Sequence, residues 1–308
     1  MTDQAPRIHN EIYPFLHPSK FRNSLKGQVV LITGAIGTIA SAIAESFATA
    51  GASLFLSDIR DSLADSTKER LLHLGADAVH YSRCDVNAAV GNVDVLINGA
   101  GVVGVRVFHK QDPSLFFRDM AINLNGPLML MRLVMPSFIE RRRGCVINVA
   151  SRAGSLNVPF NISYSTSKAA LIRLTSAIQA EVDEVAPSSD IQLYSIHPGA
   201  VLDGQRDAAL AEFPHITSRF AEWKNKFTGS PGLAGMACVA LATGIAKDVL
   251  RGRYFDVEQD LEDIISNAAL LKADPLLHTL HVTLLGSLER EEGAVDREPE
   301  APFDFPGF

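Results

Sequence analysis

The sequence is poor in cysteine and has no long hydrophobic run. Its 308 residues contain three cysteines, Cys84, Cys145 and Cys238, with no Cys-x-x-Cys pair and no metal-ligand spacing. Isolated cysteines among apolar neighbours are typical of free thiols in a reducing compartment. No apolar run approaches the roughly 18 residues of a membrane-spanning helix, and the proline-bearing N-terminus has no signal-peptide core. These absences predict a cytoplasmic protein with no metal site and no membrane partner.

Positive charge is also scarce. Lys and Arg number 28 against 35 Asp and Glu, which gives a net charge of −7 and a pI near 5.7. A nucleic-acid-binding protein needs a basic surface stripe, so this class is excluded. The only dense basic run, Arg141-Arg142-Arg143, precedes Gly144. Cations there complement a helix C-terminus, which we favour over an anion-docking site.

Apolar runs and helix-forming stretches alternate along most of the chain. The runs that predict strands are 28–33, 53–58, 79–83, 93–98, 145–150, 191–196 and 253–257, and the main helical stretches are 41–50, 114–140, 161–185 and 233–249. This alternation predicts a single α/β domain over residues 25–260, with a doubly wound, Rossmann-like parallel sheet of about seven strands. Residues 1–24 lack periodicity and are interpreted as an arm lying on the surface or on a partner. Residues 261–308 are expected to be a C-terminal extension.

A glycine turn follows the first predicted strand. The turn is Gly34-Ala35-Ile36-Gly37-Thr38-Ile39-Ala40, between an apolar run and a helix. A strand, a glycine turn and a helix N-terminus form the geometry that holds a pyrophosphate on free backbone N–H groups. Asp58, at the end of the second strand, stands near the roughly 20-residue offset at which a carboxylate binds an adenosine ribose. The carboxylate would repel a 2′-phosphate, which favours NAD(H) over NADP(H). Arg60 keeps NADP(H) open, and a helix cap is the other interpretation of Asp58.

Tyr164 and Lys168 stand four residues apart at the start of an apolar, helix-forming run. At 3.6 residues per turn both side chains leave the same face of a helix. A fixed positive charge near a phenol pulls its pKa of about 10 toward working pH. Such a tyrosine can exchange a proton with a substrate hydroxyl. Taken alone, the pair is also compatible with an ordinary amphipathic helix.

Together these motifs resemble those of the short-chain dehydrogenase/reductase family, over about residues 25–260. The motifs fall in the order of the family and are the glycine turn, Asp58, Cys84-Asp85-Val86, Leu96-Ile97-Asn98-Gly99-Ala100-Gly101, Asn123 in Ile122-Asn123-Leu124-Asn125-Gly126, Ser151 after Ile147-Asn148-Val149-Ala150, Tyr164 with Lys168, and Pro198-Gly199. Ser151 precedes Tyr164 by 13 residues, which is the usual interval in the family.

The resemblance implies a role for each motif residue. Ser151 would hydrogen-bond the substrate oxygen, Tyr164 would transfer the proton, and Lys168 would hold the nicotinamide ribose and acidify the tyrosine. Asn123 would complete a proton path through water. The residues expected to contact the cofactor NAD are Gly34, Gly37, Thr38, Ile39, Asp58, Asp85, Val86, Asn98, Tyr164, Lys168, Pro198, Gly199 and Val201. The expected assembly is a homodimer or homotetramer.

Four positions depart from the family pattern. Thr38 and Ala40 replace glycines of the turn, Gly99 stands where a second asparagine is usual, and Asp203 stands where a threonine commonly meets the nicotinamide amide. A β-branched Thr38 puts bulk where the backbone should approach phosphate. These changes are expected to bear on the affinity for the cofactor.

The largest departure is a missing helix between the third and fourth strands. Only residues 84–92 join them, too few for the dozen or more residues of a helical crossover. The link is expected to be extended, unless it comes from a faulty gene model. Apolar side chains near 93–97 should then be exposed. We hypothesise that a second subunit fills this space, or else the leucines of the tail, which are Leu276-Leu277, Leu280, Leu284-Leu285 and Leu288.

The substrate side is predicted to be hydrophobic. Residues 201–231 are expected to form a flap, with an apolar stripe made of Leu202, Leu210, Phe213, Ile216, Phe220, Trp223 and Phe227. Such a stripe is more often core than ligand contact. The arm and the run 250–260 look like those of fungal members attached to secondary metabolism. His197 is interpreted as a satisfied strand-end residue and no catalyst.

The function predicted from these residues is an oxidoreductase. It would interconvert a secondary alcohol and a ketone on a hydrophobic small molecule, by hydride transfer with NAD(H). The alternative is a protein with the same fold but without redox turnover, acting as a cyclase, a dehydratase or a binding scaffold.

Overall fold

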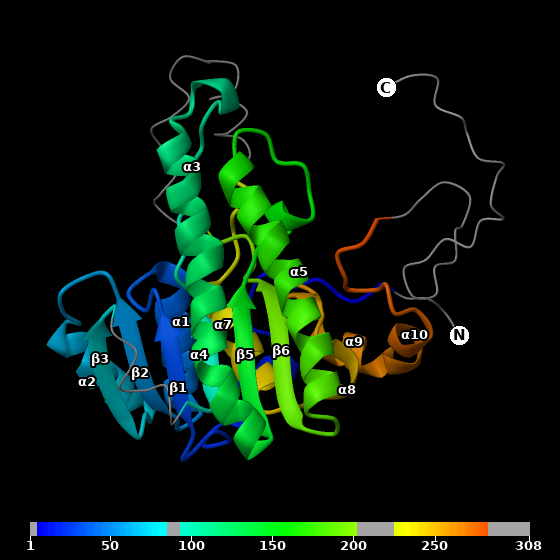
Figure 1. Cartoon of the computed structure of the whole chain (residues 1–308). Helices are drawn as coiled ribbons and strands as arrows, with labels where there is room; N and C mark the ends of the chain where they lie inside the picture. Colours follow the sequence, from blue (N-terminus) through cyan, green and yellow to red (C-terminus); the bar gives the residue numbers. More distant parts are fainter. Residues whose placement is uncertain (1–4, 85–92, 202–224, 283–308) are drawn as a thin grey trace, which may run out of the picture.

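The sheet is built from seven parallel strands, as the sequence predicts. The computed structural model describes residues 5–84, 93–201 and 225–282. In these ranges the strands pair in the order β3-β2-β1-β4-β5-β6-β7 (Figure 1). The strands are β1 (Val29–Thr33), β2 (Ser53–Asp58), β3 (Ala78–Arg83), β4 (Val95–Asn98), β5 (Arg143–Val149), β6 (Asp190–His197) and β7 (Tyr254–Asp256). The doubly wound α/β fold is therefore confirmed.

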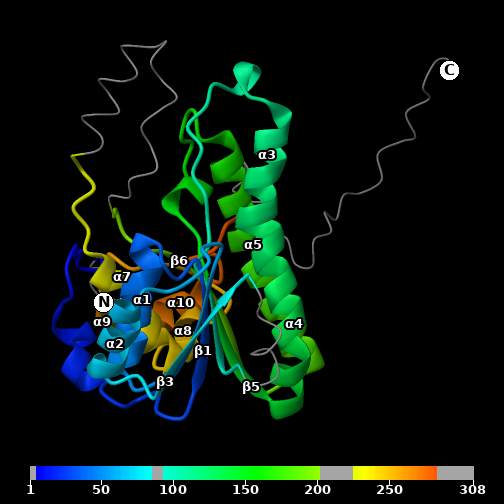
Figure 2. The same ribbon diagram turned by 90° about the vertical axis from the view of Figure 1, so that its left-hand side faces the viewer.

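Helices cover both faces of the sheet (Figure 2). One core lies between the sheet and α1, α7 and the arm, and a second core lies between the sheet and α4 with α5. The helices of eight or more residues are α1 (Thr38–Thr49), α2 (Asp65–Leu74), α3 (Pro113–Met120), α4 (Gly126–Arg141), α5 (Ile162–Val185) and α7 (Pro231–Ala242). Shorter ones are η1 (Pro14–Leu16), η2 (Pro18–Lys20), η4 (Phe108–Lys110), the π-helix η5 (Ala121–Asn125), η6 (Arg152–Gly154), α8 (Lys247–Leu250), α9 (Leu261–Ser266) and α10 (Ala268–Ala273).

The sequence explains why these elements form. All four residues of β4 are buried, as expected for a strand that is covered on both faces. Helix α7 begins with Pro231 at its first turn, and it is apolar all round because it is buried between α1 and the sheet. Helix α4 ends at Arg141, as expected from the basic run, and Arg141 pairs with Asp94 at 2.6 Å.

The expected exposure near residues 93–97 is not found. Val93, Leu96 and Ile97 are each 0% exposed, and Met131, Val134 and Phe138 of α4 pack in the same core as Val93 and Leu96. That prediction is wrong because side chains of α4 cover this face of β4. The link itself, residues 85–92, lies outside the described residues. Along the same face, β2 carries the half-buried Phe55, which stacks on His80 of β3.

The described part of the tail lies at the other end of the sheet. The amide of Tyr254 in β7 donates to the carbonyl of His278 at 2.8 Å, and Arg253 donates to the carbonyl of Leu277 at 2.6 Å. Arg173 of α5 donates to the carbonyl of Leu280. The segment around Leu277 and Leu280 therefore borders β7 and not β4, which corrects the hypothesis that these leucines fill a gap at β4. Leu284, Leu285 and Leu288 lie outside the described residues.

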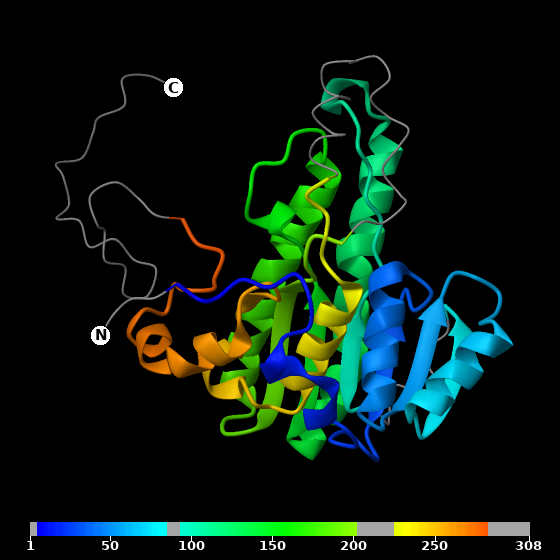
Figure 3. The same cartoon turned by 180° about the vertical axis from the view of Figure 1, so that it is seen from behind.

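The N-terminal arm packs on the domain itself. It runs past α9 and over α7 (Figure 3), and it buries Tyr13, Leu16, Phe21 and Leu25 in the α1–α7 core. Ile8 forms an antiparallel bridge with a residue that follows β7. The segment 5–25 is thereby a structural part of the domain. No helix in the described ranges combines the length and the apolar character that crossing a bilayer requires.

Candidate active site

The glycine turn lies at the carboxyl edge of the sheet, where β1 and β4 send their chains to opposite faces. Gly34 has φ +66°, and a Cβ on it would lie 2.6 Å from the Ala100 Cα. Only glycine fits this position. Gly37 is the N-cap of α1, and no side chain caps the first turn. The first N–H groups of α1 are therefore free of side-chain partners, as binding of a phosphate group requires.

Thr38 and Ala40 are accommodated in different ways. Thr38 is the first residue of α1 and its side chain is exposed, so it does not fill the turn. Ala40 is buried, and a Cβ added to Gly99 would lie 3.1 Å from the Ala40 methyl and 2.7 Å from the Thr33 carbonyl oxygen. Gly99 thus leaves the space that the Ala40 methyl occupies. The two departures from the family pattern are complementary.

Asp58 at the end of β2 is held against the glycine turn. Its carboxylate accepts from the main-chain N–H of Ile36 at 3.1 Å and from that of Arg60 at 3.3 Å. The Arg60 side chain is 58% exposed and lies 3.8 Å from the carboxylate. Asp58 therefore ties β2 to the turn and does not cap a helix. Asp85 and Val86 lie outside the described residues, as does Asp203.

Asn98 is directed into the sheet. Its amide donates to Asn148 of β5 at 2.7 Å, and Asn148 in turn donates to Thr175 of α5 at 2.9 Å. Asn98 is 1% exposed. Its side chain therefore joins β4 to β5, and its main chain leads into the segment Gly99 to Gly101 beside the glycine turn.

Tyr164 and Lys168 lie together on the first turns of α5. The Lys168 ammonium is 5.6 Å from the centroid of the Tyr164 ring and donates to the Val149 carbonyl at 2.6 Å. Lys168 is 4% exposed, and burial lowers its pKa from 10.5 to about 8. Val149 is the last residue of β5, two residues before Ser151, so this bond anchors the lysine beside the serine loop.

Ser151 is the N-cap of the short helix η6. Its hydroxyl accepts from the main-chain N–H of Ala153 at 3.1 Å, and the residue is 9% exposed. Because this N–H uses one acceptor site of the hydroxyl, the hydroxyl hydrogen remains for another acceptor. Ser151 thus stands at the carboxyl end of β5 with a fixed side-chain direction.

Asn123 lies in the π-helix between α3 and α4. Its side chain accepts from the N–H of Val102 at 2.8 Å and donates to the Val102 carbonyl at 2.9 Å and to Ser167 of α5 at 3.1 Å. A Cβ added to Gly101 would lie 3.4 Å from Asn123 Oδ1 and 3.6 Å from Lys168 Nζ. Asn123 and Lys168 therefore converge on Gly101.

The π-helix changes which atom of Asn123 is available. The side chain of Asn123 is 0% exposed, and its oxygen and its NH₂ group are already hydrogen-bonded. Pro127, four residues later, has no N–H to give to the Asn123 carbonyl. The main-chain oxygen has therefore lost its α-helical donor. Single π-turns of this kind are frequent at functional sites.

The segment after β6 forms a tight turn. Gly199 has φ +88°, and the Val201 N–H donates to its carbonyl at 2.9 Å. The Ala200 N–H donates to Glu258 at 2.8 Å. Pro198 and Val201 are buried. Residues 202–224 of the predicted flap lie outside the described residues.

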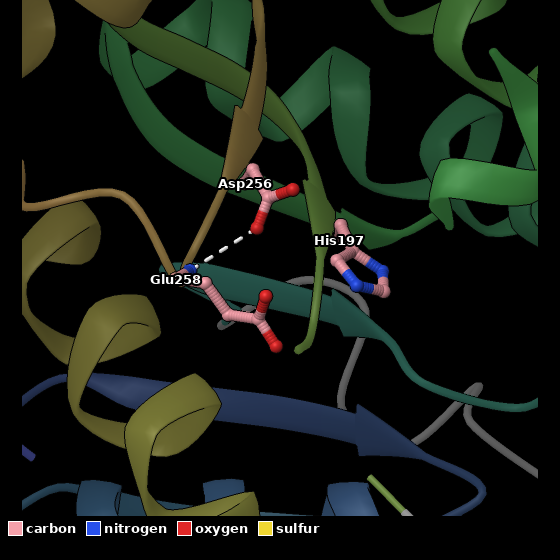
Figure 4. Close-up of side chains that lie close together, drawn as sticks. All are labelled: His197, Asp256 and Glu258. Atoms are coloured by element: carbon pink, nitrogen blue, oxygen red, sulfur yellow. Dashed lines mark hydrogen bonds between the residues drawn. The ribbon is translucent and has the colours of Figure 1, made fainter. Parts of the chain in front are cut away.

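Sequence reasoning missed an ion-pair cluster beside Ser151. Arg152 donates to Asp256 and to Glu258, both at 2.5 Å. The side chain of His197 lies next to these carboxylates (Figure 4). Its Nδ1 accepts from the Arg152 N–H at 3.4 Å, whereas its Nε2 has no hydrogen-bond partner in the described part of the chain. Burial and the Arg152 charge lower the pKa of His197 to about 3, so the ring is neutral.

Comparisons with known proteins agree with this fold. A family model described as short chain dehydrogenase matches residues 28–212. The chain therefore belongs to the short chain dehydrogenase/reductase family, and it is an oxidoreductase by family. The family and fold expected from the sequence are confirmed.

Relatives are found among fungal proteins and solved structures. A short chain dehydrogenase of Pseudocercospora fijiensis is 28% identical over 290 residues, which is 87% of this chain and 92% of that protein. A 3-oxoacyl-[acyl-carrier protein] reductase with bound NAD from Brucella melitensis has a TM-score of 0.66 and 25% identity, covering 82% of this chain and 97% of that one. A 7 alpha-hydroxysteroid dehydrogenase complexed with NADH and 7-oxo glycochenodeoxycholic acid has a TM-score of 0.64 and 26% identity, covering 81% of this chain and 100% of that one.

Proposed function

We propose that this protein interconverts a secondary alcohol and a ketone on a hydrophobic small molecule, with NAD(H) as the cofactor. The observation that carries the proposal is the buried Lys168 ammonium, which lies 5.6 Å from the Tyr164 ring and is bonded to the Val149 carbonyl beside Ser151. Burial of a cation costs free energy, so a lysine kept in such a place points to a function. The role that the family resemblance gives to Lys168 is in proton transfer.

The site fits a dinucleotide. The bare Gly34 and the uncapped N-terminus of α1 suit a pyrophosphate, and Asp58 at the turn suits a ribose with free hydroxyls. When bound, the nicotinamide supplies the hydride chemistry. Asp58 supports NAD(H) over NADP(H) because its charge would repel a 2′-phosphate. Arg60 is already drawn to Asp58, which lessens its availability for a phosphate.

The side chains of the protein bind the substrate oxygen and transfer its proton. Ser151 hydrogen-bonds the substrate oxygen, and Tyr164 gives or takes the proton at that oxygen, with the Lys168 charge favouring the phenolate. The Asn123 main-chain oxygen, freed by Pro127, holds a water that connects Lys168 to solvent. The remaining cofactor contacts are proposed to come from Pro198, Gly199 and Val201.

Several features support a hydrophobic substrate and a homo-oligomer. A hydrophobic substrate is supported by the resemblance to fungal members attached to secondary metabolism, and by the likeness to a hydroxysteroid dehydrogenase that is complexed with 7-oxo glycochenodeoxycholic acid. Leu128, Met129 and Leu133 are exposed on the outer side of α4, which supports a homodimer or homotetramer. We place the protein in the cytoplasm because free cysteines suit a reducing compartment. The alternative, a scaffold without turnover, is weakened by the fit of Ala40 against Gly99.

A Tyr164→Phe variant tests the proton transfer. It removes the hydroxyl, so turnover of secondary alcohols or ketones should fall about 100- to 10,000-fold, while NADH affinity stays within about threefold. The control is Tyr194→Phe, whose hydroxyl bonds Gln192 inside the sheet, and it should retain turnover. Retained activity in Tyr164→Phe would overturn the assignment.

Titration with NADH and NADPH, followed by nicotinamide fluorescence, tests the cofactor. NADH should bind at least about tenfold more tightly, because a buried like charge beside the 2′-phosphate costs more than 1.4 kcal/mol. Asp58→Ala should reduce that preference. Binding of neither nucleotide favours the scaffold alternative.

A further inference from the structure

Three segments of the carboxyl edge meet at one ion-pair cluster. Arg152 follows Ser151 in η6, Asp256 ends β7, and Glu258 lies two residues further on. Figure 4 shows the side chains of Asp256 and Glu258, with that of His197 at the end of β6, turned toward a common space. Arg152 donates Nε–H to Asp256 and Nη2–H to Glu258, each at 2.5 Å. The two carboxylates are largely buried, with the side chains of Asp256 and Glu258 14% and 11% exposed, whereas the Arg152 side chain is 39% exposed.

The guanidinium, and not a metal ion, is the cation that fits this cluster. The ligand atoms of His197, Asp256 and Glu258 lie within 4.8 Å of one another, a set of metal-binding type. The Arg152 fork already neutralises one oxygen of each carboxylate. The His197 Nδ1 accepts the Arg152 N–H, which puts the ring proton on Nε2 and leaves no lone pair there for a metal. A metal would have to displace the arginine and change the tautomer.

Glu258 uses its two oxygens on two different sides of the site. Oε2 holds Arg152 of the serine loop, and Oε1 accepts from the Ala200 N–H at 2.8 Å in the turn after Pro198 and Gly199. The main-chain N–H of Glu258 donates to Asp256 at 3.1 Å, which fixes the two carboxylates relative to each other. One carboxylate therefore bridges the loop of the catalytic serine and the turn that would cover the nicotinamide.

We propose that Arg152 and Glu258 are positioning residues that hold Ser151 in register with the Pro198–Gly199–Ala200 turn. The inference rests on the proposed function for its catalytic meaning, although the bridge itself is a structural statement. Charge-assisted hydrogen bonds are the strong class of hydrogen bond, and Arg152 makes one to each of two largely buried carboxylates, where salt screens them less than at the surface. A substitution that loosens the serine loop should therefore also loosen the Pro198–Gly199–Ala200 turn, and the reverse, because Glu258 bonds to both segments.

The experiment compares Arg152→Met, Glu258→Gln and the double variant with the parent enzyme. Glu258→Gln keeps an oxygen for the Ala200 N–H but loses the charge that pairs with Arg152. The matched control is Arg70→Met with Glu45→Gln, because that arginine–glutamate pair is also charge-assisted, with two bonds at 2.6 and 3.1 Å, but joins α2 to α1 at the surface. The readouts are hydrogen exchange of the peptide that contains Ala200, the dissociation constant of NADH, and kcat separated from KM.

The bridge predicts effects across the site. Arg152→Met should speed exchange at Ala200 about fivefold or more, although Arg152 does not touch that amide. Both single variants should lower kcat about tenfold at saturating cofactor, and the double variant should be no worse than the poorer single one, since residues in one network are not additive. The surface pair should change none of these values.

Two results would overturn the inference. One is unchanged exchange at Ala200 in Arg152→Met, and the other is a double variant whose loss equals the product of the single losses. A general loss of folding is detected by the melting temperature of each variant. If the parent turns over no alcohol or ketone, the proposed function fails, and exchange at Ala200 still decides whether the bridge exists.

Discussion

The buried charge of Lys168 lowers the stability of the fold. It is 4% exposed, and among the described residues its ammonium meets the Val149 carbonyl and no carboxylate. Burial lowers its pKa from 10.5 to about 8, which corresponds to a cost of roughly 3 kcal/mol for keeping the charge inside the fold. A buried charge that costs this much is the reason that Lys168 is a candidate functional residue.

Replacement of Lys168 should therefore separate stability from activity. Lys168→Met removes the cost of the buried charge and loses one hydrogen bond worth about 1 kcal/mol. The free energy of unfolding at pH 7 should rise by roughly 1 to 2 kcal/mol, while turnover is lost. Urea unfolding measures the first quantity and a steady-state assay the second. A clear loss of stability would show that Lys168 is a structural residue.

The pH dependence of that gain has a fixed sign. Below about pH 8 the lysine is charged in both states, so the folded parent carries the full cost. Between pH 8 and 10.5 the unfolded chain binds the proton and the folded one does not, so the stability of the parent rises with pH. The advantage of Lys168→Met should be largest below pH 8 and shrink toward pH 10.5. Lys68→Met, at an exposed lysine on α2, is the control variant.

At the scale of elements, the sequence revealed what depends on local pattern. Apolar runs predicted all seven strands, most directly β1, β4, β5 and β6, which are almost continuously buried, whereas the edge strand β3 is only partly buried. Helix α2 was missed because it buries only Leu71, so it has almost no apolar stripe. Helix α9 carries a readable signal, Asp260, whose side chain caps the N–H groups of Glu262 and Asp263. The π-helix, which interrupts the helical stretch expected over 114–140, was not predicted, although Pro127 stands four residues after Asn123.

Other parts of the site depend on contacts that no local pattern encodes. Arg152 reaches Asp256 and Glu258 across separations of 104 and 106 residues. The motif order located Ser151, Tyr164, Lys168 and Asn123, because in this family their spacing follows from the strand and helix that carry them. The sequence could not show that the Asn123 side chain would form hydrogen bonds with Val102 and Ser167.

The contact between β1, β4 and α1 allows a direct test of complementary substitutions. Gly99→Ala places a methyl 2.7 Å from the Thr33 carbonyl oxygen and 3.1 Å from the Ala40 methyl. Overpacking of this kind should cost about 1 to 3 kcal/mol of unfolding free energy. In an Ala40→Gly background the cost of Gly99→Ala should be smaller by at least about 0.5 kcal/mol.

The control for this cycle is Gly126→Ala at the start of α4. An added methyl there meets the Ala121 carbonyl oxygen at 3.7 Å, an ordinary contact. It should leave stability unchanged or raise it, since alanine favours helix. Strict additivity of Gly99→Ala and Ala40→Gly would show that the two positions are independent.

At the scale of the whole molecule, the N-terminal arm is hydrogen-bonded to the segment that follows β7 at the edge of the sheet. The His9 N–H donates to the Glu258 carbonyl at 2.7 Å, and the Asp260 N–H donates to the Arg7 carbonyl at 2.9 Å. Arg7 also pairs with Asp263 at 2.7 Å. The arm thus runs beside the same segment, residues 256–260, that carries the carboxylates of the ion-pair cluster. The N-terminal segment and the substrate side of the sheet are parts of one folded unit.

This coupling predicts that a substitution in the arm destabilises the entire domain. Leu16 is 0% exposed in the α1–α7 core, so Leu16→Ala should lower the free energy of unfolding by about 2 to 5 kcal/mol, in a single cooperative transition. Ile8→Ala, in the same arm but at a residue 66% exposed, should change it by less than about 0.5 kcal/mol. Urea unfolding followed by circular dichroism in both the far and the near ultraviolet measures the two variants. An arm that docked loosely would instead give Leu16→Ala a small effect, or an early separate transition, because the sheet and its helices would stay folded without it.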